Sequence, residues 1–342
     1  MQPRPRVLAV AQSARVGGAE LALARLAERL PGLGFDVETA SPGAGADHHL
    51  GVGGLTPGAW PRALGAWPRA RSLARRFDVV MLNGIVTQRL APAMTAATIV
   101  PYIHELSDSP PRAWGSARFW LSAPLVMCAC EAVAQRCRAL GAPGDRLRTV
   151  YAPVETVAPA DRPEWVGDGP VVGYVGRIEA AKGTLDLVRA MRSVDAKLVI
   201  AGEGSGPYAE EVRREADVWL GRVEDARTLM SWFDLLAVPS HQEAFGTVAA
   251  EALAAGTPVV ATRGGGIEEY VVPGRNGELV MPGDTEALAQ AIRELLPRAN
   301  SMAEAARADA ARFAADKVAA HVADVLLEAI AKRTPRPRAT AE

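Results

Sequence analysis

Two glutamates, Glu243 and Glu251, stand on either side of the point where a helix is predicted to begin. An apolar run over 235–238 predicts a buried strand, and the pattern over 248–255 predicts the helix that follows it. Thr247 and Glu251 are four residues apart, so they share one face of that helix. Glu251 can therefore accept hydrogen bonds from ribose hydroxyls, while Glu243, in the loop ahead, can accept them from the hydroxyls of a sugar.

The first turn of the same helix offers backbone donors. Its N–H groups have no partner within the helix, and the positive end of the helix dipole favours anions there. The donors belong to Phe245, Gly246, Thr247 and Val248. Such a group of N–H donors suits a pyrophosphate.

A second candidate site follows the apolar run over 171–175, which predicts another strand. Gly176 allows the chain to bend sharply and to approach a ligand closely. Arg177 and Lys182 then place two cations beside the beginning of the next helix, at the edge of the sheet where open α/β folds bind ligands. The alternative is that both cations are solvated surface charges.

The elements that must position these residues alternate between strand and helix. Strands that alternate with helices favour an α/β fold with parallel sheets covered on both faces. The expected strands are 6–10, 36–40, 79–82, 98–103, 125–129, 171–175, 197–201, 235–238 and 258–261. The expected helices are 19–30, 184–192, 208–216, 248–255 and 317–332.

A change of composition after Val150 divides the chain. The proline-rich stretch that follows has no periodicity, which is typical of a linker between domains. The expected organisation is therefore two Rossmann-like domains with a linker between them and a C-terminal helix that packs back on the N-terminal domain. The boundaries are 1–155 and 170–316 for the domains, 156–169 for the linker, 317–332 for the helix and 333–342 for a frayed tail.

The loop and helix around the two glutamates read PS-x-x-E-x-F-G…E-A-L-A-x-G-T-P-V-V. This pattern resembles the retaining glycosyltransferases of GT-B fold, which include sucrose-synthase-like enzymes and bacterial mannosyl- and glucosyltransferases. The segments RVGGAELALARLAERL, GYVGRIEAAKG and GGGIEEYVVPGRNGELVMPGD are similar to the same family, in order. The resemblance covers about Arg6 to Leu296. It implies two facing domains with a cleft between them, the first binding the acceptor and the second the nucleotide-sugar donor.

The resemblance also implies roles for single residues. Glu251 would bind the ribose, Glu243 the transferred sugar, and the backbone near Val223 the base. Arg177 and Lys182 would bind the diphosphate. The residues implied to act in catalysis are His104, Arg177, Lys182 and Glu243.

Two further candidates lie in the first half of the chain. Gly17 and Gly18 follow the first predicted strand, where glycine permits close approach by a phosphate or an acceptor. His104 matches a position at which the family places a histidine facing the sugar. A lone histidine at a strand end could also be purely structural. Cys130 and the Ala152–Pro153 pair depart from the family pattern, at the acceptor side and at the turn between domains.

The expected reaction moves a sugar from a UDP- or GDP-sugar to a small-molecule, glycan or lipid-linked acceptor. The family implies retention at the anomeric carbon. No cofactor is expected, and no metal, because the chain has no Asp-x-Asp pair and Arg177 and Lys182 supply positive charge. The alternatives are another enzyme on the same scaffold, such as a nucleotide-sugar epimerase, and an inactive sugar-nucleotide-binding partner of an active enzyme.

Composition excludes other classes of protein. The 342 residues include 38 basic and 39 acidic side chains, a balance that argues against binding nucleic acid. The cysteines at 128, 130 and 137 are expected to be reduced and buried, as in a cytosolic protein. The N-terminus lacks a signal-peptide pattern, and no apolar run approaches the roughly 20 residues that span a bilayer. We therefore expect a cytoplasmic protein.

The motif GAWPRA occurs twice, at Gly58–Ala63 and Gly65–Ala70. A proline in each copy argues against a regular helix throughout. The favoured interpretation is a variable loop that half-buries Trp60 and Trp67. The alternative is a tryptophan- and arginine-rich surface that makes weak peripheral contact with a membrane.

Overall fold

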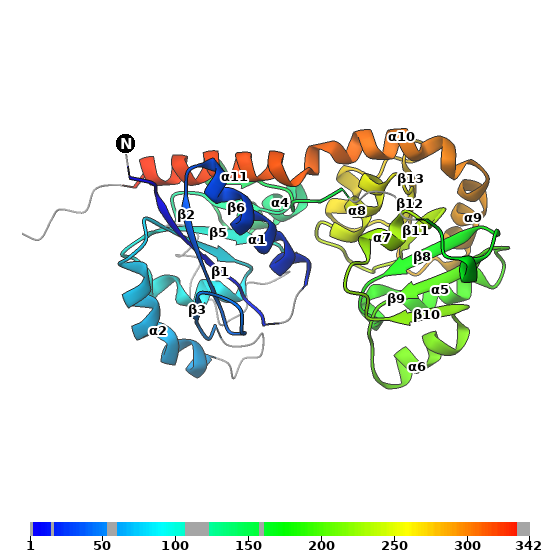
Figure 1. The fold of residues 1–342 in the computed structure, drawn as a ribbon, viewed down its shortest axis with the longest axis horizontal. Coiled ribbons are helices and arrows are strands. Elements are labelled where there is room, and N and C mark those ends of the chain that lie inside the picture. The colour runs from blue at the N-terminus through cyan, green and yellow to red at the C-terminus, as the bar shows by residue number, and fades with distance from the viewer. Residues whose placement is uncertain (1–2, 15–16, 53–59, 107–122, 157–160, 334–342) are drawn as a thin grey trace, which may run out of the picture. The chain divides into compact units, whose positions relative to one another are not determined.

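The computed structural model describes residues 3–14, 17–52, 60–106, 123–156 and 161–333, with the backbone alone for 60–62 and for Trp165. The chain forms two compact units, which are described separately (Figure 1). The first contains residues 1–153 and 315–342, and the second contains residues 154–314.

The first unit is built on a parallel sheet of seven strands among the described residues. Their order is β3-β2-β1-β4-β5-β6-β7, so the direction of winding reverses between β1 and β4. The strands are β1 (Arg6–Val10), β2 (Asp36–Ser41), β3 (His48–His49), β4 (Val79–Asn83), β5 (Thr98–Ile103), β6 (Val126–Cys128) and β7 (Leu147–Thr149). The α-helices are α1 (Gly18–Arg29), α2 (Trp60–Ala74), α4 (Glu131–Ala139) and α11 (Ala315–Ala331).

The C-terminal helix α11 is part of the core of this first unit. Its residues Val318, Val322 and Leu326 are buried in one cluster with Tyr102 of β5 and Leu26 of α1. An ion pair of 2.6 Å between Arg148 and Glu328 joins the helix to β7, and it holds the pKa of the Glu328 carboxyl far below its usual range, at about 2. The chain therefore leaves the first unit after Pro153 and returns to it at Ala315.

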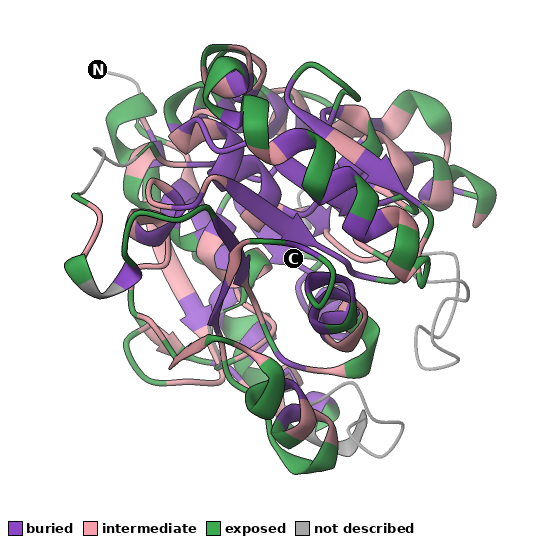
Figure 2. Cartoon of the chain, turned by 90° about the vertical axis from the view of Figure 1, so that its right-hand side faces the viewer, coloured by how far each residue is buried: buried purple, intermediate pink, exposed green. Residues whose placement is uncertain are grey.

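The second unit also has a parallel sheet, of six strands among the described residues, in the order β10-β9-β8-β11-β12-β13. The strands are β8 (Val171–Val175), β9 (Lys197–Ala201), β10 (Val218–Gly221), β11 (Leu235–Val238), β12 (Val259–Thr262) and β13 (Gly277–Val280). The α-helices are α5 (Thr184–Met191), α6 (Gly206–Glu215), α7 (Arg227–Met230), α8 (Thr247–Ala255), α9 (Thr285–Leu295) and α10 (Ala299–Ala310). Figure 2 shows strands that are mostly buried and helices with exposed outer faces.

Every strand predicted from the sequence is present, with ends that differ by at most one residue. The prediction of a Rossmann-like α/β fold is confirmed, as is the burial of Cys128, Cys130 and Cys137. The segment expected to be a linker, 156–169, belongs to the second unit. At the start of the second unit, the Val154 N–H donates to the carbonyl of Phe313 at 2.7 Å, so the residues where the chain enters and leaves this unit lie side by side.

The prediction that the repeated GAWPRA motif cannot be a regular helix throughout is wrong for its second copy, Gly65–Ala70, which is helical. In the first copy, Gly58 and Ala59 lie outside the described residues, as does the side chain of Trp60 with its expected half-burial. Helix α2 runs from Trp60 to Ala74 and includes both prolines of the repeat. Pro61 is in the first turn, where the N–H needs no helical partner. Pro68 removes one bond from the interior, but Leu64, four residues earlier, is 48% exposed, so water can satisfy its carbonyl. Trp67 donates from Nε1 to the carbonyl of Arg89 at 3.0 Å and is half-buried.

Candidate functional site

The residues predicted to bind the donor follow β8 and β11, which are neighbours in the sheet of the second unit. From β8 the strands continue in one direction through β9 to β10, and from β11 in the other through β12 to β13. At β8 and β11 the connections therefore run in opposite directions, which makes the carboxyl ends of these two strands the topological switch point of the sheet. In open α/β sheets this is where ligands bind.

Glycine brings the two loops at this switch point into contact. After β8 the chain turns through Gly176 and Lys182 and reaches Gly183, which has a φ of +63°. A Cβ atom on Gly183 would lie 2.0 Å from the carbonyl oxygen of Pro239, directly after β11. The His241 N–H also donates to the carbonyl of Ala181 at 3.0 Å. Only a residue without a side chain allows the turn after β8 to press so closely against the loop after β11.

This contact joins two residues that were predicted to have separate roles. The Lys182 ammonium lies 2.7 Å from Oε2 of Glu243, and the two side chains are 23% and 21% exposed. The hydroxyl of Ser240 donates to the same carboxylate oxygen at 3.0 Å. Both contacts use Oε2, so Oε1 is the oxygen that Glu243 can offer to a ligand.

Arg177 lies apart from this ion pair. Its side chain is 75% exposed and pairs with Glu179 at 3.0 Å. The Tyr174 hydroxyl donates to the Arg177 carbonyl at 2.7 Å, so the backbone is fixed while the guanidinium extends into solvent. The role of Arg177 at a diphosphate stays a prediction.

Aromatic residues pack against the beginning of α8 and support it. Gly246, with φ +79°, precedes the helix, and the Tyr270 hydroxyl lies 2.7 Å from the carbonyl oxygens of both Phe245 and Gly246. The rings of Phe245, Tyr270 and Phe313 pack against one another at 5.2 to 5.3 Å between centroids. Thr247 and Val248 are half-buried in the first turn. The N–H groups of this turn are therefore presented by a rigid support.

Glu251 is nearly enclosed. It lies one turn after Thr247 on α8 and is 8% exposed, which is rare for a carboxylate. Val223 lies beyond the end of β10, two strands away from β8, and is half-buried. The second unit therefore spreads its candidate residues along one edge of the sheet, from Val223 past Lys182 to Glu243 and α8.

The candidates in the first unit also lie at the carboxyl edge of their sheet. Gly17 and Gly18 are exposed at the start of α1, after β1. His104 follows β5, and its Nε2 is 2.8 Å from Oδ1 of Asn83, the last residue of β4. The imidazole packs against Tyr102 with 4.1 Å between ring centroids. Burial lowers the pKa of His104 to about 3, so the ring is neutral near pH 7.

Sequence reasoning did not single out two acids, Glu105 directly after His104 and Glu20 on α1. The Glu105 carboxylate accepts from the N–H groups of Ile85, at 3.2 Å, and His104, at 3.1 Å. Burial raises the pKa of Glu105 and also that of Glu20 on α1. The only signal in the sequence was the position of Glu105 directly after His104.

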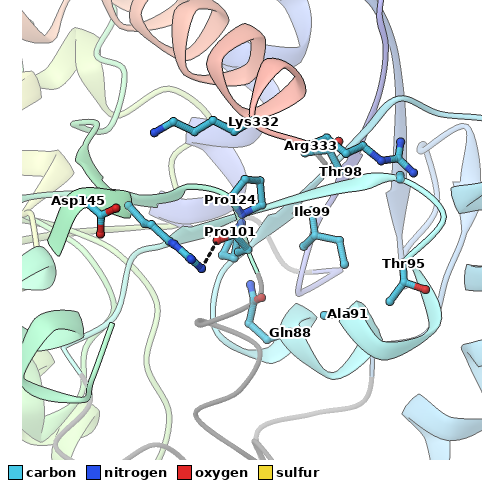
Figure 3. A pocket seen from close by; sticks show the side chains of 13 residues that line it. Gln88, Ala91, Thr95, Thr98, Ile99, Pro101, Pro124, Asp145, Lys332 and Arg333 are labelled. Atoms are coloured by element: carbon cyan, nitrogen blue, oxygen red, sulfur yellow. Dashed lines mark hydrogen bonds between the residues drawn. The ribbon is translucent and has the colours of Figure 1, made fainter. Parts of the chain in front are cut away.

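A cavity of about 560 Å³ lies at the opposite edge of the first unit's sheet (Figure 3). Its lining includes Gln88, Thr98, Pro124, Asp145 and Lys332, at the amino ends of β5, β6 and β7. His104 and Asn83 lie at the carboxyl ends of their strands, so this cavity is separate from the candidate site.

Within the described residues, no group of three or more His, Cys, Asp or Glu side chains is arranged to hold a metal ion. In the same residues, no helix is both long and apolar enough to cross a bilayer.

Two family models match the chain, one to each unit. The model described as "Glycosyltransferase Family 4" matches residues 16–157, and the model described as "Glycosyl transferases group 1" matches residues 169–298. Together they span both sets of candidate residues.

The chain is also similar in sequence to curated enzymes. The chain is 36% identical over 216 residues to a D-inositol 3-phosphate glycosyltransferase of Xylanimonas cellulosilytica, which covers 57% of this chain and 52% of the relative. It is 35% identical over 183 residues to a glycogen synthase of Mycobacterium tuberculosis, which covers 48% and 44% respectively. The chain thus spans about half the length of the curated relatives it matches.

Solved structures match over nearly the whole chain. HepE of Anabaena in complex with UDP-glucose has a TM-score of 0.82 at 23% identity, over 94% of this chain and 99% of that one. A sucrose-phosphate synthase of Thermosynechococcus elongatus has a TM-score of 0.76 at 22% identity, over 94% and 98%. At these identities the structures show the fold, which is GT-B.

Proposed function

We propose that this chain, which belongs to the GT-B-fold glycosyltransferases, moves a sugar from a nucleotide-diphosphate sugar to an acceptor hydroxyl. The observation that carries the proposal is the set of residues at the switch point between β8 and β11. There the Lys182 ammonium, the Glu243 carboxylate and the first turn of α8 converge from two neighbouring loops. A cation and helix N–H groups suit a diphosphate, and a carboxylate suits sugar hydroxyls.

In this proposal the second unit supports departure of the nucleoside diphosphate from the anomeric carbon. Negative charge grows on the leaving phosphate as the bond breaks, and the transferred sugar acquires oxocarbenium character. Lys182 and the N–H groups at the start of α8 lie ready to stabilise that charge without reorganising. The acceptor hydroxyl attacks on the face from which the phosphate departs, which retains the anomeric configuration.

The printed names of the relatives guide the proposed substrates. HepE was solved with UDP-glucose and with UDP, which favours a UDP-sugar over a GDP-sugar as donor. The curated relatives are named for inositol phosphate and glycogen, which favours a polyol or sugar hydroxyl as acceptor. We place the reaction in the cytoplasm, where nucleotide sugars are made.

A thermal-shift screen of UDP-, GDP-, ADP- and TDP-sugars tests the proposal. A donor that binds the folded chain should raise its melting temperature in a concentration-dependent way. Product analysis with the donor labelled in its sugar then identifies the reaction. Label found in a new glycoside supports the proposal, and label found only in an epimerised donor excludes it. If none of the donors stabilises the chain, the switch point between β8 and β11 does not bind a nucleotide sugar.

Replacing Glu251 by glutamine should mainly raise the KM for the donor, by roughly tenfold. A ribose contact is made equally in the ground state and the transition state, so its loss weakens binding without slowing the chemical step. Steady-state kinetics with the donor varied provides the measurement. A lower kcat at unchanged donor KM would contradict the ribose role.

Excess EDTA should leave the initial rate within about twofold, a change in barrier well below 1 kcal/mol. Lys182 already supplies positive charge where a magnesium ion would otherwise act, and Glu243 is engaged by Lys182 and Ser240. The measurement compares rates in EDTA with rates after magnesium or manganese is restored. A rate that collapses and then recovers with the metal would require a metal at the donor site.

A further inference from the structure

Asn83 is a fully buried amide at the end of β4, beside the point where the first unit's sheet reverses direction. Its two polar atoms have different partners. Nδ2 is 2.9 Å from the carbonyl oxygen of Ala19 on α1, and Oδ1 is 2.8 Å from Nε2 of His104. A backbone carbonyl can only accept a hydrogen bond, so the atom facing Ala19 must be the NH₂ group. The orientation of the amide is therefore fixed, and its oxygen faces the imidazole.

This orientation determines which ring nitrogen of His104 carries the proton. Oδ1 has no hydrogen to give, so the hydrogen bond with His104 exists only if Nε2 is protonated. A neutral imidazole has a single N–H, and the low pKa of His104 keeps the ring neutral. Nδ1 is therefore a bare acceptor.

Nδ1 is also open to a ligand. It has no hydrogen-bond partner among the described residues. It is also not one of the fully buried polar atoms that lack a partner, and His104 as a whole is half-buried, so Nδ1 can be reached from outside. The surrounding ionisable groups are otherwise engaged. Glu105 and Glu20 accept from backbone N–H groups, with Oε1 of Glu20 buried without a partner, and the Tyr102 hydroxyl donates to the carbonyls of Val150 and Tyr151.

From this geometry we infer that Asn83 is a positioning residue, which holds His104 in the Nε2–H form so that Nδ1 accepts a hydrogen bond from a hydroxyl of the bound substrate. The inference rests on the proposed function, which supplies a hydroxyl-rich ligand. It specifies the chemistry of that contact. Nδ1 recognises a hydrogen-bond donor, so phosphate, carboxylate and carbonyl oxygens are excluded as its partners. The hydroxyl can belong to the sugar of the donor or to the acceptor.

The tautomer can be measured without any substrate. The full chain is labelled with ¹⁵N-histidine, and the imidazole nitrogens are followed by NMR between about pH 5 and pH 8. His104→Gln identifies the His104 signals. The wild type should show a neutral ring with Nε2 protonated over this whole range. A ring with Nδ1 protonated, or one that becomes an imidazolium within this range, would overturn the inference.

Two variants separate positioning from folding. Asn83→Asp retains the volume, replaces the Nδ2 donor to Ala19 by an oxygen and places a carboxylate against Nε2. In the folded variant, which a thermal melt verifies, the pKa of His104 should rise and imidazolium should appear toward pH 5. Asn83→Ala removes the acceptor, so both neutral tautomers should be populated. Thr87→Val is the matched control, because it removes a buried hydroxyl that donates to the neighbouring Gly84 carbonyl and does not contact His104. An unchanged His104 spectrum in both Asn83 variants, or an equal change in Thr87→Val, would contradict the assignment.

Kinetics then identifies the source of the hydroxyl. His104→Ala removes Nδ1 and should raise one KM roughly five- to tenfold, as expected for one lost hydrogen bond. Asn83→Ala should raise the same KM by a smaller factor, because part of the population keeps Nδ1 unprotonated. A rise for the donor alone assigns the hydroxyl to the transferred sugar, and a rise for the acceptor alone assigns it to the acceptor. No rise in either overturns the inference. If the thermal-shift screen finds no donor while NMR still shows the Nε2–H form, the proposed function fails and the tautomer assignment stands.

Discussion

Replacing Lys182 by alanine should lower kcat by roughly two to three orders of magnitude, the effect of removing one group that stabilises a developing anion. The ammonium is at the carboxyl edge of β8 and only partly exposed, where water screens its charge weakly. Because Lys182 lies in a turn outside the core, the melting temperature should change little. The measurement is kcat at saturating donor, together with a thermal melt of the variant.

The matched control is Arg189→Ala. Arg189 is the basic residue of α5, six positions after Gly183, and it pairs with Glu211 at 3.6 Å. Its loss changes the charge of the second unit by the same amount and should leave kcat near the wild-type value. Near-wild-type turnover in Lys182→Ala, or an equal loss in Arg189→Ala, would remove Lys182 from the proposed diphosphate site.

Lys182 could also act only by holding Glu243, because the two form an ion pair of 2.7 Å. A double-mutant cycle with Glu243→Gln separates these roles. If Lys182 only positions Glu243, the double variant is no slower than the slower single variant. If each residue also contacts its own part of the donor, the double variant is slower than either single variant. We expect the second result.

The central strands could be predicted from the sequence because both of their faces are buried. Val171–Val175 and Thr98–Ile103 are apolar runs for that reason, and their ends were predicted correctly. The strands at the sheet edges were missed. His48–His49 has two polar residues and shows no apolar run, and Val218–Gly221 has an apolar run of only three residues and is half-buried throughout. Helix α2 was missed because the cost of Pro68 was weighed without knowing that Leu64 is exposed.

The residues of the candidate site could be predicted from the sequence, but the contacts between them could not. Glu243, Thr247 and Glu251 could be placed on their loop and helix from spacing alone, because spacing fixes which residues share a helix face. The ion pair between Lys182 and Glu243 joins residues 61 positions apart. It depends on how two turns pack, which no local pattern encodes.

Replacing Gly183 by alanine should destabilise the second unit by roughly 3 to 5 kcal/mol. A left-handed backbone conformation costs a residue with a side chain roughly 1 to 2 kcal/mol, and Gly183 has a φ of +63°. The remaining cost is steric. The new Cβ would lie 2.0 Å from the carbonyl oxygen of Pro239, a backbone atom that cannot rotate away as a flexible side chain can. The turn after β8 and the loop after β11 would have to separate.

Gly274→Ala isolates the steric part of this effect. Gly274 lies in the same unit with φ +74°, and a Cβ there would meet nothing within 4 Å. Its replacement should cost only the conformational share, roughly 1 to 2 kcal/mol. Urea unfolding of the second unit measures the free energy of unfolding of both variants. The difference between the two values is the cost of pushing the two loops apart. That separation also pulls Lys182 away from Glu243, so Gly183→Ala should lose transfer activity under conditions where it remains folded, while Gly274→Ala should keep it. Equal destabilisation by both substitutions would show that the turn after β8 does not press against Pro239.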